Sequence, residues 1–305
     1  MASSRNLAGA AFMTVSMAGF TLSDAISKFM FDFIGMGQLM LVRGLIASAL
    51  VGLLAWSRGA YAKPAAMLHP MVLLRVFGES AATLTFFVGL NSMPLPNVSA
   101  IMQALPLAVT AGAALVFAEP VGWRRWSAIA VGFIGVLLIV RPGGDGFNTA
   151  SLWVLACVFF CVVRDLATKR VPEDIHSLAV SSATAVSVTL IGAAMVATTG
   201  GWTPLEPAHL GLIAVAAVLL LFGYQFVIMA MRSGDISFVA PFRYTALIWA
   251  LALGWLVFAT LPDPLTLAGS AIIVGSGLYM LWRESRLDRP VAAETTRPSM
   301  APDGL

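Results

Sequence analysis

The sequence predicts an all-α integral membrane protein of ten transmembrane helices, arranged as two inverted five-helix repeats around a central cavity. Three observations support this prediction: the apolar composition, ten long apolar runs and an internal repeat. Of the 305 residues, 59% are hydrophobic and only 11% are charged, whereas soluble domains are about 25% charged. Because a spanning helix needs about 20 apolar residues, the chain has room for about ten spans and none for a soluble domain.

The first apolar run, residues 7–28, is too long for the apolar region of a cleavable signal peptide and lacks a small-residue cleavage site. We therefore count it as a span. Loops that contain Gly, Pro or Arg separate the runs that follow. These runs are 35–56, 71–91, 96–117, 124–140, 149–168, 177–199, 208–231, 237–259 and 265–282. The fourth contains Pro106 and the ninth contains Pro241, and each proline should bend its helix and make it a candidate gate.

The distribution of Lys and Arg predicts the orientation of the chain. With the N terminus in the cytoplasm, twelve of the 18 basic residues fall in cytoplasmic segments and two, Lys28 and Arg141, fall on the opposite side. The remaining four lie within apolar runs. This asymmetry follows the positive-inside rule. We therefore expect a multi-pass protein of a bacterial-type inner membrane with both termini in the cytoplasm, and a disordered cytoplasmic tail over residues 284–305.

Shifting the sequence by 141 residues aligns its two halves. The shift superimposes an Asp-x-x-Ser/Thr-Lys pattern at 24–28 on the one at 165–169, and it holds without a gap from the first span through the fourth. Chance similarity between apolar stretches is the alternative. Five is an odd number of spans, so a second repeat must enter the membrane inverted, as in many secondary transporters that bind cargo between their repeats. The expected units are residues 1–142 and 148–283.

The composition excludes several classes of function. Three Lys, three His and two Cys cannot supply a disulfide framework, a zinc cluster or a Walker-type loop, so we expect no cofactor, no metal and no ATP-driven pump. The basic residues form no patch, which argues against nucleic acid as a partner. An integral-membrane enzyme is the alternative to a transporter, but the chain lacks motifs such as His-Glu-x-x-His and Gly-x-Ser-x-Gly.

Several stretches resemble one transporter family. They are the Asp-x-x-Ser-Lys pattern at 24–28, the stretch 38–44, the run 104–107, and the stretches 117–120 and 123–126 that lead into a Gly-containing helix ending at Arg141 and Pro142. With ten spans in two halves, the chain resembles the EamA-domain family of the drug/metabolite transporter superfamily. The resemblance implies a basket of inverted repeats, alternating access and, in many members, export of amino acids or similar metabolites. Among characterised types it is similar to the YddG-like aromatic amino-acid exporters.

Two charged residues within spans are the first candidates for cargo binding, because charges in a bilayer are costly and face a cavity or one another. Glu79, near the middle of the third span, could bind an ammonium group or carry a proton. The alternative is an ion pair with Arg75, four residues earlier on the same helix. Arg243, beside Pro241, could grip a carboxylate at two points. Its alternative is to extend toward the cytoplasmic interface.

The other candidates for cargo binding are polar and aromatic side chains in the third, fourth, eighth and ninth spans, which the resemblance places around the cavity. They are Thr83, Gln103, Tyr224, Gln225, Tyr244 and Trp249. The repeat pairs Thr83 with Tyr224 and Gln103 with Tyr244. These groups could hydrogen-bond a cargo, and the aromatic rings could stack on it. Hydrogen bonds between helices are the alternative use.

A last group of residues is expected to be structural or to contribute to gating. Asp24 with Lys28, and Asp165 with Lys169, are spaced four residues apart at membrane boundaries, which favours local salt bridges over gating contacts. Arg43 in the second span is expected to be structural, paired with Asp24. We expect no redox or metal role for the two cysteines.

The sequence thus predicts a secondary transporter of a small zwitterionic metabolite, most directly an exporter of aromatic or large apolar amino acids, with the lipid bilayer and the cargo as its partners. In this hypothesis Arg243 binds the carboxylate and Glu79 the ammonium group. The runner-up cargo is a nucleobase, a nucleotide-linked compound or a drug-like metabolite. Phosphates would require several basic residues at mid-membrane, and the four arginines within spans are expected near an interface. The oligomeric state, flux direction and coupling ion stay open.

Overall fold

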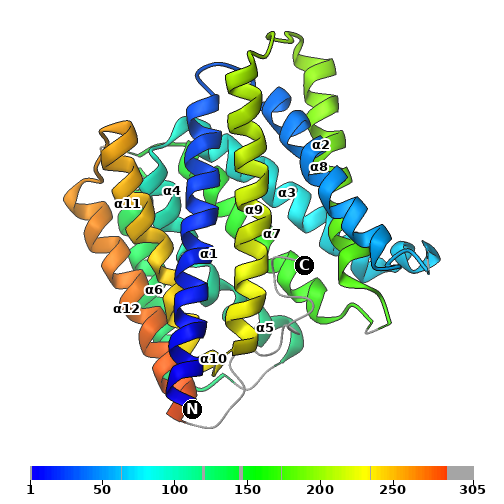
Figure 1. Ribbon diagram of the computed structural model, residues 1–305. Coiled ribbons are helices and arrows are strands. Elements are labelled where there is room, and N and C mark those ends of the chain that lie inside the picture. The colour runs from blue at the N-terminus through cyan, green and yellow to red at the C-terminus, as the bar shows by residue number, and fades with distance from the viewer. Residues whose placement is uncertain are drawn as a thin grey trace.

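The computed structural model describes residues 2–62, 64–118, 121–143, 147–172, 174–233 and 235–286, and in these ranges all regular structure is helical (Figure 1). The helices are α1 (Ala2–Met30), α2 (Met36–Ser57), η1 (Pro64–Leu68), α3 (Pro70–Ser92), α4 (Leu95–Met102), α5 (Leu105–Phe117), α6 (Trp123–Val140), α7 (Ala150–Lys169), α8 (Ser177–Thr199), α9 (Pro207–Ser233), α10 (Ile236–Val239), η2 (Ala240–Tyr244), α11 (Thr245–Phe258) and α12 (Pro264–Arg286).

Ten of the described segments are long and apolar enough to cross a membrane, from Arg5–Met30 to Pro264–Arg283. This confirms the predicted fold class. Their outer faces carry large apolar side chains such as Leu53, Leu115 and Leu256, which in water would form an aggregation-prone surface. A bilayer is the solvent in which such faces are stable, because the helices satisfy their own backbone hydrogen bonds.

The two spans that contain the expected bends are interrupted. The fourth span divides into α4 and α5, and Pro106 lies in the first turn of α5. The ninth span begins as α10, passes through η2 with Pro241 in its first turn, and continues as α11. A proline lacks the backbone N–H that would continue the ladder of helical hydrogen bonds. Each break therefore leaves irregular backbone inside the bundle, where it borders the cavities described below.

Backbone geometry shows the repeat independently of sequence similarity. Helices α5 and α11 both end at an alanine in the left-handed conformation, Ala118 with φ of 52° and Ala259 with φ of 50°. Residues other than glycine rarely adopt this conformation, and these two alanines are 141 residues apart. The same shift relates α1 to α7 and α3 to α9.

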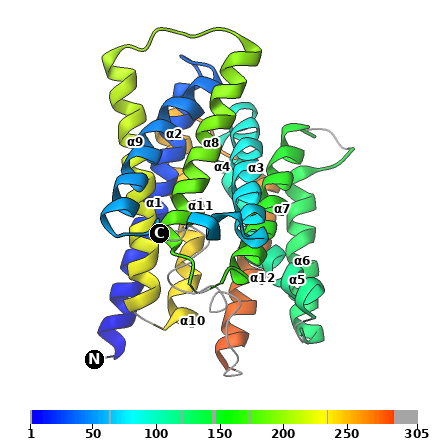
Figure 2. The same cartoon turned by 90° about the vertical axis from the view of Figure 1, so that its right-hand side faces the viewer.

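Each strong helix pairing joins one repeat to the other. Helix α1 packs along α9, α2 along α8, α3 along α7 and α6 along α12. The first of these pairs is seen in Figure 1, and Figure 2 shows α8 beside α2 and α7 beside α3. The repeat maps the α1/α9 pair onto the α7/α3 pair. Helices of both repeats therefore surround the space between the two halves. Glycines allow the closest approach of α6 to α12, where a Cβ at Gly135 would lie 2.7 Å from the carbonyl oxygen of Gly269.

Helix α12 continues through Arg286, so the first three residues of the tail expected over 284–305 are helical. Residues 287–305 lie outside the described residues.

Candidate functional site

Two adjoining cavities lie between the repeats. The first has a volume of about 240 Å³ and the second about 250 Å³. Both are bordered by Asp24, Phe86 and Met102, so these three side chains form a shared wall. Asp24 comes from α1, Phe86 from α3 and Met102 from the end of α4, at the break in the fourth span. Together the cavities form a two-part interior site at the seam of the repeats, where inverted-repeat transporters bind cargo.

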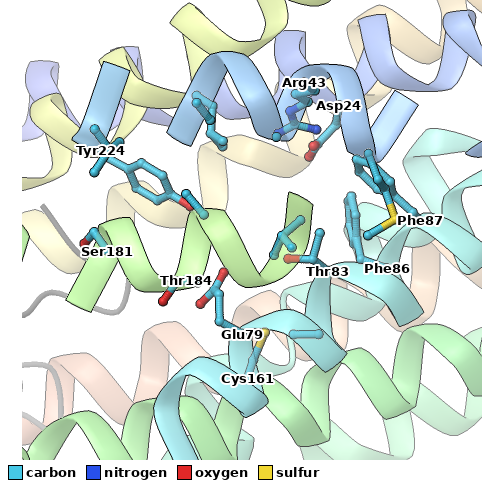
Figure 3. Close-up of a pocket in the computed structure, with 18 of the residues that line it drawn as sticks. Asp24, Arg43, Glu79, Thr83, Phe86, Phe87, Cys161, Ser181, Thr184 and Tyr224 are labelled. Carbon is cyan, nitrogen blue, oxygen red and sulfur yellow. The ribbon is translucent and has the colours of Figure 1, made fainter. Parts of the chain in front are cut away.

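The first cavity combines opposite charges with aromatic walls (Figure 3). Arg43 from α2 donates from Nη1 to Ser27 Oγ at 3.0 Å, and its guanidinium carbon lies 5.4 Å from the centre of the Phe87 ring. Asp24 lies beside Arg43 (Figure 3) and interacts with it electrostatically. The sequence predicts that Asp24 and Arg43 lie close together. It also predicts a purely structural role for Arg43, whereas both side chains border the cavity.

Glu79, also in the first cavity, does not pair with Arg75. Its Oε2 accepts from Nη1 of Arg164 on α7 at 2.9 Å, and Arg164 Nε donates to Oδ1 of Asp165 at 2.7 Å. Arg75 Nη1 instead donates to Thr184 Oγ1 on α8 at 3.1 Å. The alternative, a direct salt bridge within α3, is not formed among the described residues, although Glu79 and Arg75 interact electrostatically. The pair that forms joins the two repeats, since α3 belongs to the first and α7 to the second.

Three of the four arginines within spans have little exposed surface. Arg43 is 9% exposed, Arg75 is 4% exposed and Arg164 is 7% exposed, so all three are buried in the bundle. Their guanidinium groups are held beside the cavities, because a buried cation needs polar partners that the surrounding lipid cannot offer. The expectation that these arginines lie near an interface stays a prediction.

The second cavity brings together residues from both broken spans. It is bordered by Gln103 and Pro106 from the fourth span and by Arg243 and Tyr244 from η2. Gln103 and Tyr244, which the repeat relates, thus lie in one cavity. The Tyr244 hydroxyl turns toward α12 and occupies the space that a side chain at Gly277 would need. Asp165 also borders this cavity, so Arg164 holds one carboxylate from each cavity.

The structure places two of the other candidates at the site and two away from it. Thr83 and Tyr224, a second pair related by the repeat, both border the first cavity (Figure 3). The Tyr224 ring packs edge-on against Phe20 at 5.1 Å between centroids. Gln225 and Trp249 are exposed and border neither cavity. Gln225 follows Tyr224 directly, so the helical rotation of 100° per residue turns it to the outer face of α9.

The two lysines of the repeated pattern have partners other than a helical neighbour. Lys28 Nζ donates to the Leu90 carbonyl at 2.8 Å and forms no ion pair with Asp24 among the residues the structure describes. Lys169 Nζ lies 4.9 Å from the centre of the Phe117 ring. The salt bridge expected between Asp24 and Lys28 is therefore wrong. Lys28 instead closes the end of α3 by satisfying one of the carbonyls that a helix terminus leaves free.

Several side chains of the site were missed from sequence. They are Arg164, Phe86, Phe87, Met102, Cys157, Cys161, Ser181 and Thr184. One signal was present in the repeat: the shift of 141 residues places Thr184 where the first half has Arg43. The spacing of Cys157, Cys161 and Arg164 also places them on one face of α7. Neither signal says which face meets a cavity, since that depends on how the helices of the two repeats pack.

Histidine supplies none of the polar groups of the two cavities. Nδ1 of His69 accepts from the Met71 backbone N–H at 3.2 Å, and Nδ1 of His176 accepts from the Leu178 backbone N–H at 3.2 Å. Both rings thus cap helix starts, at α3 and α8. The site acts through carboxylate, guanidinium, hydroxyl and amide groups set in apolar walls, a combination suited to non-covalent binding.

Comparison with known proteins places this architecture in a family. The model of the EamA-like transporter family matches residues 7–141 and 148–282. A riboflavin transporter of Rhizobium johnstonii is 27% identical over 220 residues, which is 72% of each chain. An S-adenosylmethionine uptake transporter of Rickettsia conorii is 30% identical over 70% of this chain and 71% of its own. A pseudopaline exporter of Pseudomonas aeruginosa is 25% identical over 85% of this chain and 91% of its own.

A solved crystal structure shares the fold, with a TM-score of 0.59 and 15% identity over 91% of this chain and 96% of the other. The two family matches start 141 residues apart, which is the shift that relates the two halves of the sequence and of the backbone. The chain belongs to the EamA-like transporter family, and thus to the small-metabolite carriers of the drug/metabolite transporter superfamily.

Proposed function

We propose that this transporter carries an amino acid or an amino-acid-derived metabolite with an aromatic or large apolar body, by alternating access. One observation carries the proposal: Arg75 is a buried guanidinium without a carboxylate at ion-pairing distance in the part of the chain that the structure describes. Its hydrogen-bond partner is the neutral Thr184 hydroxyl. Its electrostatic partner Glu79 is bound by Arg164. A buried cation that forms no salt bridge of its own is costly, and an anion in the cavity would reduce that cost.

The rest of the first cavity fits the other parts of such a cargo. Glu79 uses Oε2 to bind Arg164, and its second oxygen is available for an ammonium group. Phe86, Phe87 and Tyr224 supply aromatic surface, against which an apolar or aromatic side chain gains burial and stacking energy. In this assignment Arg75 replaces Arg243 as the carboxylate ligand, because Arg75 shares a cavity with Glu79 and Arg243 borders the other one.

The flux direction we propose follows the cargo gradient, so that a cargo accumulating in the cytoplasm is exported. The relatives include an uptake transporter and an exporter, which supports a fold that is competent in both directions. We further propose an inner-membrane location with both termini in the cytoplasm, on the basis of the asymmetric Lys and Arg distribution. The proposed role is transport without enzymatic turnover.

A flavin or nucleoside compound is the second candidate cargo. The two adjoining cavities favour it, because a flat ring system in one could continue past Phe86 into the other. Relatives named as riboflavin and S-adenosylmethionine transporters add support. The burial of Arg43, Arg75 and Arg164 is also compatible with anionic groups on such a cargo.

Counterflow in proteoliposomes tests the proposal. Vesicles loaded with an unlabelled compound are assayed for uptake of its labelled form, with amino acids, riboflavin and S-adenosylmethionine compared side by side. We expect exchange of aromatic and large apolar amino acids, with KM raised about 10- to 100-fold in Arg75→Gln, since hydrogen bonds to charged groups contribute about 1.5–3 kcal/mol. Arg75→Lys should recover part of the loss. Exchange of riboflavin alone, unaffected by Arg75→Gln, would reject the amino-acid assignment in favour of the second candidate.

A further inference from the structure

Helices α3 and α7 touch backbone to backbone where their charged residues meet. A Cβ added at Gly78 would lie 2.9 Å from the Arg164 backbone nitrogen and 3.1 Å from the Phe160 carbonyl oxygen. Gly78 therefore permits an approach that any side chain would prevent. Glu79 follows Gly78 directly, so its ion pair with Arg164 lies at the closest point between the two repeats on this side of the site.

The repeat relates this crossing to a second one, between α1 and α9, in which the backbones also approach closely but the positions equivalent to the ion pair are uncharged. The shift of 141 residues maps Gly78, Glu79 and Arg164 onto Leu219, Leu220 and Ser23, in the α1/α9 pair. There Gly19 provides the close approach, and its Cβ would lie 3.3 Å from the Leu219 carbonyl oxygen. Ser23 Oγ donates to the Ala216 carbonyl at 2.9 Å. The backbone contact is thus shared by both crossings, while the ion pair is confined to α3/α7.

The two carboxylates around Arg164 differ in how they move. Asp165 is its neighbour on α7 and travels with it, whereas Glu79 belongs to α3. If α3 and α7 separate, the pair between Glu79 and Arg164 has to break, and Arg164 keeps Asp165 as a counterion. Separation of the helices then leaves Glu79, a carboxylate in the wall of the first cavity, without its ion-pair partner. A cation bound there would replace the lost partner.

We propose that Arg164 is a positioning residue for transport: it ties α3 to α7 through Glu79, and a cationic group of the cargo releases this tie by taking its place on Glu79. Release of the tie by a cationic group rests on the proposed function, which supplies the cargo, whereas the tie itself does not. A ligand shifts a conformational equilibrium by its differential affinity for the two states, and the substitution of cargo for Arg164 provides that difference. The α1/α9 crossing has no ion pair at the equivalent positions Leu220 and Ser23, so cargo controls one of the two related crossings.

The native cysteines report on this tie without any cargo. Cys157 and Cys161 are the only cysteines of the chain, both are buried, and both pack against Ala82 of α3. They therefore lie where the α3/α7 interface meets the first cavity. When the helices part, N-ethylmaleimide should reach them faster. The rate of alkylation, followed by mass spectrometry on the purified full-length protein in detergent, measures how often the cavity wall formed by α3 and α7 becomes accessible.

The test is a double-mutant cycle with Glu79→Gln, Arg164→Gln and the double variant. Each single variant should raise the alkylation rate about fivefold or more, in the range of conformational couplings of about 1–3 kcal/mol. The double variant should match Arg164→Gln, because the pair between Glu79 and Arg164 is already lost there and Asp165 loses Arg164 in both variants. Arg164→Lys, which keeps the charge, should alkylate near the wild-type rate. The control is Arg141→Gln, which breaks an ion pair between the repeats at the ends of α6 and α12 and should leave the rate unchanged.

Additive effects of the two substitutions, or wild-type alkylation in Glu79→Gln, would overturn the inference. The result stands apart from the cargo assignment, since alkylation needs no cargo. If the double-mutant cycle shows coupling but no amino acid is exchanged, the proposed cargo is rejected and the tie is retained. If amino acids are exchanged but the cycle shows no coupling, the tie is rejected and the cargo is retained. Where exchange is found, Arg164→Lys should keep kcat within about threefold of wild type and Arg164→Gln should lower kcat more than it changes KM, as expected for a residue that acts on a conformational step.

Discussion

Arg75 shows at the residue scale how a buried charge can define a binding site. It is 4% exposed, and within the described ranges its hydrogen bond goes to a hydroxyl and not to a carboxylate. Arg164, buried to a similar degree, has two carboxylates at 2.9 Å and 2.7 Å. The two arginines therefore have different roles. Arg164 is neutralised by the protein, whereas we propose that Arg75 gains an anionic partner from the cargo.

A second residue, Asp263, allows a prediction about pH. Asp263 precedes α12, where its Oδ1 accepts from the backbone N–H groups of Leu265 and Thr266 and from Arg141. Partial burial acts to raise the pKa of this carboxyl, but the hydrogen bonds from Thr266 and Arg141 outweigh it and lower the pKa to about 2. The group thus contributes stability above its unfolded pKa of about 3.8, and that contribution is lost as pH falls toward 2.

Asp263→Asn should lower the thermal unfolding temperature at pH 7 by a small amount. Asparagine keeps the helix cap and loses the charge, and the side chain of Asp263 is 43% exposed, so solvent screening limits the loss to about 1 kcal/mol or less. The difference from wild type, measured by differential scanning fluorimetry in detergent, should shrink between pH 4 and pH 2. A difference that grows on acidification would contradict this account of Asp263.

At the element scale, the α3/α7 crossing combines packing with charge. Gly78 allows the two backbones to approach at Arg164. Glu79, the next residue, forms its ion pair with the side chain of the same Arg164. The two roles depend on each other, because separation of the helices by even 1 Å would lengthen the ion pair beyond the hydrogen-bonding distance. Packing at Gly78 therefore keeps Glu79 within hydrogen-bonding distance of Arg164.

Gly78→Ala should destabilise the protein by about 1–3 kcal/mol, the usual cost of overpacking, and should also raise the alkylation rate of Cys157 and Cys161. The added methyl group meets backbone atoms of α7, which cannot move aside as a flexible side chain can. Gly275→Ala is the matched control, because a Cβ at Gly275 meets nothing within 4 Å and alanine favours the helix. Equal unfolding temperatures for the two variants would show that the α3/α7 approach is looser than described.

At the scale of the whole molecule, the sequence predicts what depends on composition and period. The ten spans, their order and the interruptions near Pro106 and Pro241 follow from apolar run length and proline chemistry. The repeat predicts that Gln103 and Tyr244 share surroundings, and both border the second cavity. These features require no knowledge of which helices touch.

The partners of the charged residues could not be predicted in the same way. Glu79 and Arg75 are four residues apart and look like a pair, but Arg164 reaches Glu79 from the other repeat, 85 residues away in sequence. Long-range pairing depends on which faces of α3 and α7 meet, and an apolar helix surrounded by lipid and protein has little amphipathic signal to indicate its buried face. The outward turn of Gln225 and Trp249 escaped prediction for the same reason.

The central claim is that Arg75 and Glu79 bind the two charged ends of one cargo, and competition by truncated cargo analogues tests it most directly. Counterflow of labelled phenylalanine is measured in wild type, Arg75→Gln and Glu79→Gln, with unlabelled phenylalanine, phenethylamine and 3-phenylpropionate as competitors. Wild type should prefer phenylalanine over both analogues by about tenfold or more. Arg75→Gln should lose its preference over phenethylamine, which lacks the carboxylate, and Glu79→Gln its preference over 3-phenylpropionate, which lacks the ammonium group. Equal loss of both preferences in each variant, or retention of both, would contradict the assignment of the two ends.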